Sequence, residues 1–111
     1  MMLHQDLDKE RWFKLSLIEQ LANIGCDVER TIRWRNRGAL ESSTQAFWRV
    51  LELMDLTIAD PKNHRRLREI VRTRYILVDH FVYDNVHQTT DKIWQNYFLW
   101  FNYAAAAQSG K

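Results

Sequence analysis

An arginine in the middle of a predicted helix is the residue best placed to do chemistry. The apolar periodicity over residues 61–83 predicts a helix. Its inward stripe consists of Leu67, Val71, Arg74, Val78 and Phe81, so Arg74 is the one charged residue on that stripe. Burying a guanidinium is unfavourable unless a partner neutralises it and accepts its hydrogen bonds. We therefore expect Arg74 to contact a carboxylate, a residue across a dimer interface or a ligand phosphate.

Neighbouring residues offer Arg74 either a structural or a chemical role. The preceding predicted helix carries Glu52 and Asp55, and a salt bridge to either carboxylate would make Arg74 structural. His80 follows Arg74 by six residues, and six residues rotate by about 240° around a helix of 3.6 residues per turn. The two side chains therefore share a site only if the helix is broken or a second protomer completes it. A histidine near a helix C-terminus also interacts favourably with the helix dipole without any catalytic role.

The Arg74–x5–His80 spacing resembles the motif of HEPN proteins, which are small prokaryotic helical bundles that commonly act as dimers. The resemblance implies that Arg74 and His80 are catalytic residues that cleave RNA, without a metal, at a cleft between protomers. It also implies a role in a two-gene module, as an RNase or as the companion of a nucleotidyltransferase. The sequence departs from the family at Tyr75, where a polar residue usually follows the arginine, and at Asp79, just before the histidine. The alternative is a non-enzymatic protein–protein interaction module in which Arg74 forms a buried structural ion pair.

Basic residues cluster just before and around this motif, between positions 62 and 74, where Glu69 is the only acidic residue. Clustered cations can contact a phosphate backbone, so the candidate RNA-binding residues are Arg65, Arg66, Arg68 and Arg72. Lys62, Arg65 and Arg66 lie in the first turns of this predicted helix, where the helix dipole disfavours cations by ~0.3–1 kcal/mol each, so helix stability alone would not select them there. The alternative is a solvated face of arginines that pair with acidic neighbours.

The chain is rich in aromatic residues, with five Trp, four Tyr and five Phe among 111 residues. A core this small cannot enclose all of them, and aromatic side chains contribute a large contact area at interfaces. We therefore expect a homodimer with aromatic residues at the contact, namely Trp12, Phe13, Trp94, Trp100 and Tyr103. RNA or a cognate protein is the expected further partner.

Four amphipathic helices must position these residues. Apolar periodicity predicts them over 7–36, from 41 or 42 to 59, over 61–83, and from a cap at Thr89 or Thr90 onwards, with a loop over 84–88. Gly25 interrupts the first helix without ending it, which indicates a close crossing with another helix. Asp60 and Pro61 favour the start of the third helix. Short loops between four helices predict an all-α fold, an antiparallel up-and-down four-helix bundle in a single domain over 1–111.

Composition excludes several classes of protein. The single cysteine, Cys26, cannot form an internal disulfide, which favours a reducing compartment. No apolar run approaches the ~20 residues of a membrane span, and no signal-peptide core precedes the first helix, so we expect a cytoplasmic protein without a membrane partner. The histidines lack metal-ligand spacing and no glycine-rich phosphate loop occurs, so no metal or cofactor is expected.

Overall fold

The computed structural model describes residues 9–109, and every regular element in that range is helical. The elements in chain order are α1 (Lys9–Lys14), α2 (Leu17–Asn36), α3 (Leu40–Ala59), a 3₁₀ helix η1 (Pro61–Arg66), α4 (Leu67–Phe81) and α5 (Asp91–Ser109). The all-α class predicted from the sequence is confirmed. No helix within the described range is both long and apolar enough to cross a membrane. Positions 7 and 8, where we expected the first helix to begin, lie outside that range.

The first predicted helix is divided in two at Ser16. The Ser16 Oγ accepts a hydrogen bond from the Glu19 backbone N–H (3.1 Å), and the Glu19 carboxylate accepts one from the Ser16 N–H (2.9 Å). This capping box satisfies two N–H groups that would otherwise lack partners at the start of α2. The separate α1 directs Trp12 into the core, where its Nε1 donates to Thr57 Oγ1 (3.1 Å). The prediction of one continuous helix was therefore wrong.

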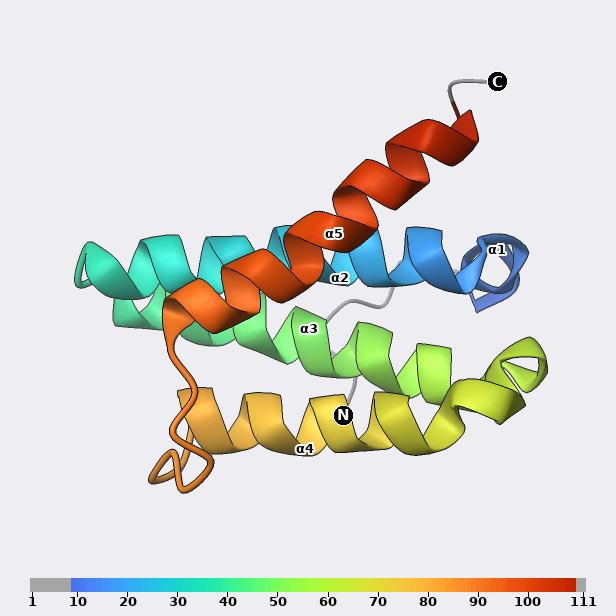
Figure 1. The fold of residues 1–111 in the computed structure, drawn as a ribbon. Helices are drawn as coiled ribbons and strands as arrows, with labels where there is room; N and C mark the ends of the chain where they lie inside the picture. The colour runs from blue at the N-terminus through green and yellow to red at the C-terminus, as the bar shows by residue number, and fades with distance from the viewer. Residues whose placement is uncertain (1–8, 110–111) are drawn as a thin grey trace.

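The four long helices run back and forth, and α2 packs against both α3 and α5 (Figure 1). In this view α5 crosses α2 at an angle, while α4 forms the lower edge of the helical array and packs on α3. Their apolar side chains meet in one core, in which Ile24, Leu53, Met54 and Leu77 are fully buried. Burial of each large apolar side chain of this kind stabilises the folded state by ~1.5–3 kcal/mol relative to leaving it exposed to water.

The close helix crossing expected at Gly25 lies between α2 and α5. A Cβ added to Gly25 would lie 2.6 Å from the Cβ of Phe98, which is closer than two carbon atoms can approach without movement. Gly25 and Phe98 are both buried. The prediction is confirmed, and this contact sets the position of α5 against α2.

The third predicted helix begins as a 3₁₀ helix rather than as an α-helix. Asp60 caps it as expected, since its Oδ1 accepts a hydrogen bond from the Lys62 backbone N–H (3.1 Å) and Pro61 occupies the first position. The Asp60 carboxylate is buried and also accepts from Gln20 Nε2 (2.9 Å). Asn63 Nδ2 donates to Gln20 Oε1 (2.9 Å), which completes a buried polar network between α2 and η1.

The rotation of α4 about its own axis differs from the prediction. Its buried positions include Ile70, Thr73 and Leu77, whereas Leu67 and Val71 are 38% and 46% exposed. The apolar residues of this segment form two neighbouring stripes, and the core is built on the stripe that contains Ile70 and Leu77. The expectation that Leu67 and Val71 point inward was therefore wrong, whereas Val78 and Phe81 of the same predicted stripe are half-buried against the core.

Candidate functional site

Arg74 lies at the edge between α3 and α4, where it forms an ion pair with Asp55. Its Nε donates to Asp55 Oδ1 (2.8 Å) and its Nη2 to Asp55 Oδ2 (3.3 Å). The Arg74 side chain is 31% exposed and that of Asp55 is 61% exposed. The pair expected for a structural role is thus present, but it is not buried. Ion pairs with this much solvent contact contribute about 0–1 kcal/mol to the free energy of unfolding.

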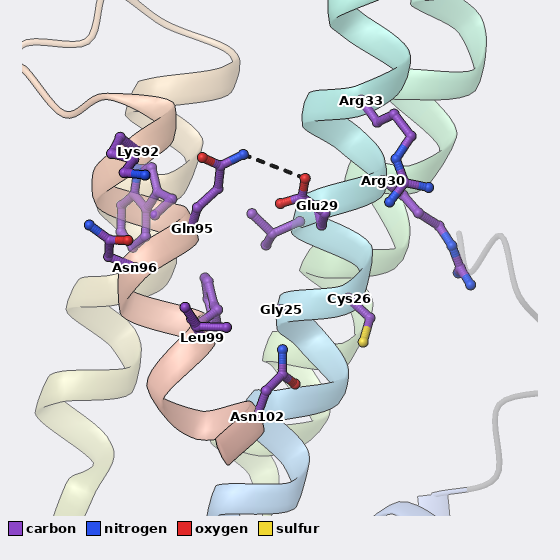
Figure 2. Close-up of a pocket in the computed structure, with 13 residues that line it drawn as sticks. Gly25, Cys26, Glu29, Arg30, Arg33, Lys92, Gln95, Asn96, Leu99 and Asn102 are labelled. Carbon is purple, nitrogen blue, oxygen red and sulfur yellow. Dashed lines mark hydrogen bonds between the residues drawn. The ribbon is translucent and has the colours of Figure 1, made fainter. Parts of the chain in front are cut away.

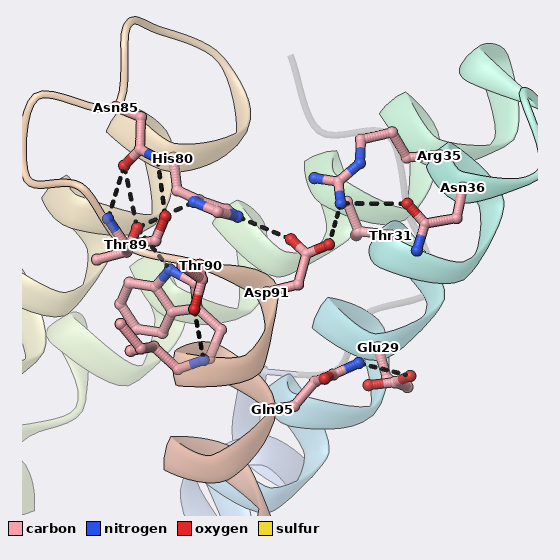
Figure 3. Close-up of polar contacts among 12 residues, drawn as sticks. Glu29, Thr31, Arg35, Asn36, His80, Asn85, Thr89, Thr90, Asp91 and Gln95 are labelled. Atoms are coloured by element: carbon pink, nitrogen blue, oxygen red, sulfur yellow. Dashed lines mark hydrogen bonds and ion pairs between the residues drawn. The ribbon is translucent and has the colours of Figure 1, made fainter.

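His80 lies in a different place, between the C-terminal end of α4 and the N-terminal end of α5 (Figure 3). Its side chain is only 7% exposed. One ring nitrogen, Nε2, is 2.9 Å from Asp91 Oδ1, and the other, Nδ1, is 2.9 Å from Thr89 Oγ1. Asp91 also forms an ion pair with Arg35 of α2. The network therefore connects α2, α4 and α5 at one end of the molecule.

The His80 imidazole lies between the Thr89 hydroxyl and the Asp91 carboxylate and is within hydrogen-bond distance of both. This is the order of groups in a nucleophilic triad. The Thr89 hydroxyl, however, is shared among three partners. It accepts a hydrogen bond from Trp94 Nε1 (3.2 Å) and lies 3.2 Å from Asn85 Oδ1, to which it can donate. A hydroxyl has one proton and two lone pairs, so these contacts leave it no free position for a substrate. This series of hydrogen bonds from Thr89 through His80 to Asp91 stabilises the connection between α4 and α5.

Asp79, which precedes His80 in α4, anchors the same connection. Its carboxylate accepts hydrogen bonds from the backbone N–H groups of Val86 and His87 (both 3.0 Å), and its Oδ2 lies 3.0 Å from His87 Nδ1. The His87 backbone N–H makes the largest contribution to holding the pKa of Asp79 below its ordinary value, and the Val86 N–H adds to it. Asp79, which departs from the HEPN pattern, thus has a structural role.

The structure does not bring Arg74 and His80 together. Arg74 faces α3 and His80 faces the start of α5, and each has its own carboxylate partner, Asp55 and Asp91. This agrees with the rotation expected from their spacing in the sequence. The partners of His80 were missed because Thr89 and Asp91 are separated from it by the loop, so no local spacing relates them to the histidine.

The predicted RNA-binding arginines are all exposed, although they differ in their partners. Arg66 donates three hydrogen bonds of 2.7–3.0 Å to the Glu69 carboxylate. Within residues 9–109 no carboxylate forms an ion pair with Arg65, Arg68 or Arg72. These three cations are therefore available to a partner.

The predicted interface aromatics divide into core and surface residues. Trp12 and Trp94 are 8% and 5% exposed and belong to the core of the protomer, so the expectation that they contact a second copy is corrected. Phe13 is half-buried, with the Lys9 ammonium 5.5 Å from its ring centroid. Trp100 and Tyr103 are 61% and 70% exposed on α5, as an interface would require.

A groove of about 610 Å³ between α2 and α5 was not foreseen (Figure 2). Gly25 lies in it, and Gln95 Nε2 donates across it to Glu29 Oε1 (3.5 Å). The rest of its polar lining consists of cations, amides and a thiol, namely Arg30, Arg33, Lys92, Asn96, Asn102 and Cys26. It was missed because its two sides come from positions 25–33 and 92–102, far apart in sequence. Among the described residues no three His, Cys, Asp or Glu side chains gather to hold a metal ion.

No protein-family model, curated protein or solved structure matches the chain. Function is therefore inferred from its own side chains and surfaces.

Proposed function

We propose that the chain is a cytoplasmic, non-enzymatic protein-interaction module in which Arg74 is a structural residue. The observation that carries this proposal is the separation of Arg74 and His80. Asp55 engages the guanidinium of Arg74 through two hydrogen bonds, and Thr89 and Asp91 engage both ring nitrogens of His80. Both ring nitrogens of His80 are occupied, so this side chain cannot reach a scissile phosphate without losing one of its present partners. Both residues thus stabilise helix contacts.

The module is proposed to be a homodimer that pairs through α5. Ile93, Trp100 and Tyr103 are 50%, 61% and 70% exposed, and their spacing places them on the side of α5 that faces away from the core. We further propose that α2, α3, α4 and α5 form an antiparallel up-and-down four-helix bundle. Their back-and-forth course in Figure 1 supports this description.

Contact with RNA, as the HEPN resemblance implies, is the second candidate function. The unpaired arginines Arg65, Arg68 and Arg72 favour it, since cations that lack a carboxylate partner can neutralise phosphates. RNA cleavage would additionally require His80 of one protomer to leave Asp91 or Thr89 and to meet Arg74 of another. We therefore prefer the protein-interaction module to RNA contact as the proposed function.

An RNA-cleavage assay with thermal melts tests the proposal. Wild type, Arg74→Ala and His80→Ala are incubated with labelled single-stranded RNA, with and without a chelator. We expect no cleavage above the buffer blank by any of the three proteins. The proposal is overturned if wild type cleaves RNA and both variants lose that activity while their melting temperatures stay close to that of wild type.

A further inference from the structure

The outer face of α4 carries an exposed apolar stripe whose described contact with the α4–α5 connection is an edge-on packing of the Tyr75 and His87 rings, with centroids 5.6 Å apart. We define the α4 stripe as Leu67, Val71 and Tyr75, which are 38%, 46% and 65% exposed and line one surface hollow. Intervals of four residues place these side chains along one side of the helix. Within residues 9–109, Figure 1 places α3 on one side of α4 and no helix beyond its outer edge. Contiguous apolar side chains on a surface typically mark a binding site.

One edge of the α4 stripe is lined by arginines that have no carboxylate partner. Arg68 and Arg72 line the same surface hollow as Leu67, Val71 and Tyr75. Within the described part of the chain neither arginine forms an ion pair, in contrast to Arg66 with Glu69 and Arg74 with Asp55. The positive charge along this edge is thus not neutralised by the protein itself.

We propose that the α4 stripe binds an acidic amphipathic helix of a different protein. From Leu67 to Tyr75 the stripe extends over ~12 Å at 1.5 Å per residue, which is about two helical turns. A helix with apolar residues at i, i+4 and i+7 would cover the stripe, and a row of Asp or Glu along one flank would meet Arg68 and Arg72. Guanidinium groups bind carboxylates with two hydrogen bonds, and their methylene stems can lie over apolar surface. This inference rests on the proposed interaction function and names its partner.

Two other occupants fit the surface less well. If two copies paired through this face with their α4 helices antiparallel, each flank of one helix would lie beside the same flank of the other. Arg68 and Arg72 would then face the arginines of the second copy. Like charges facing one another disfavour such a pair. RNA would neutralise the arginines and its bases could stack on Tyr75, but it offers no aliphatic side chains to cover Leu67 and Val71.

Fluorescence anisotropy with designed peptides tests this inference on the full chain. The probe is a labelled helical peptide of about 16 residues with leucines on one face and glutamates along one flank, long enough to cover the stripe. A second peptide carries lysines in place of the glutamates, and a single-stranded RNA of similar length is the third ligand. We expect the acidic peptide to bind at least about tenfold more tightly than the lysine peptide, because only the acidic one meets the arginines with opposite charge.

Surface variants locate the binding site. Val71→Ala and Tyr75→Ala should each weaken binding of the acidic peptide by about tenfold, as truncated anchor residues do. Leu99→Ala on α5 is the matched control, since Leu99 is also 46% exposed, and it should leave binding unchanged. Arg68→Glu combined with Arg72→Glu should reverse the preference in favour of the lysine peptide. Arg33→Glu with Arg37→Glu makes the same change in net charge at the C-terminal end of α2 and should not reverse it.

The possible outcomes separate this inference from the proposed function. Equal binding of the two peptides, no binding of either, or equal losses in Leu99→Ala and Val71→Ala would overturn the acidic-helix inference. RNA binding that depends on Arg68 and Arg72 but not on Val71 would also overturn it, in favour of a nucleic-acid surface. None of these results produces RNA cleavage, so the proposed non-enzymatic function fails only in the separate cleavage assay.

Discussion

Gly25 of α2 lies against Phe98 of α5 so closely that a Cβ on the glycine would be 2.6 Å from the Phe98 Cβ. Gly25→Ala should therefore destabilise the fold although alanine is the better helix former by ~1 kcal/mol. Overpacking a core typically costs about 1–3 kcal/mol, so we expect a net loss of stability in denaturant titrations. Phe98→Ala should not relieve the Gly25→Ala defect completely, since the clashing Cβ remains. An unchanged or higher stability of Gly25→Ala would show that α5 moves away freely.

Breaking the Arg74–Asp55 pair should have a small effect on stability. With side chains 31% and 61% exposed, the pair is expected to contribute about 0–1 kcal/mol. A double-mutant cycle of Arg74→Ala and Asp55→Ala, measured by denaturant unfolding, gives the coupling energy directly. A coupling several times larger would mean that the pair is shielded from solvent, for example by a second protomer.

Replacing Asp79 by asparagine should loosen the α4–α5 connection and alter the acid response. The amide side chain of Asp79→Asn would offer one carbonyl oxygen and an N–H₂ group where a carboxylate now accepts from Val86 and His87. Hydrogen exchange should therefore accelerate at those two backbone amides, while amides in the middle of α2 stay protected. Exchange at Val86 and His87 that is the same in wild type and variant would contradict the anchoring role.

Acid should destabilise the wild type through Asp79 in a predictable direction. The folded state lowers the pKa of Asp79 below its ordinary value of 3.8. A lowered carboxyl pKa adds stability that is complete above the unfolded-state pKa and is lost as the pH falls through the folded-state pKa. Stability should thus decline below about pH 4, and this decline should be shallower in Asp79→Asn. Parallel pH profiles of the two proteins would rule out this contribution of Asp79.

Charge on the outer side of α5 should disrupt the proposed homodimer. Light scattering of wild type should give about twice 13.4 kDa at micromolar concentration. Trp100→Glu places an unpaired carboxylate at the proposed contact and should give a folded monomer. Trp48→Glu is the control, because Trp48 is 50% exposed on α3, away from that contact, and this variant should remain dimeric. A monomeric wild type at all concentrations would exclude the dimer.

Features that depend on neighbouring residues in the chain were largely determined by the sequence. Apolar periodicity correctly predicted that these segments are helical, although not the division of the first at Ser16, and Asp60 with Pro61 marked the start of η1. Thr90 caps α5 as predicted, because its Oγ1 accepts a hydrogen bond from the Ile93 N–H (3.1 Å). The break at Ser16 could also have been predicted, since Ser16 and Glu19 have the spacing of a capping box. It was missed because the apolar periodicity was taken to continue across Ser16.

Tertiary structure alone decided which side of α4 faces the core. The segment carries two apolar stripes of similar quality, and local periodicity cannot rank them, because burial of Ile70 and Leu77 depends on side chains from α2, α3 and α5. That choice of rotation placed Arg74 beside Asp55, turned His80 towards Asp91, and left Val71 and Tyr75 exposed. Trp12 is buried for the same reason, since its partner Thr57 lies 45 residues away in the chain. Contacts between residues distant in sequence thus determine which chemically capable side chains meet, and the local pattern determines only that they lie on helices.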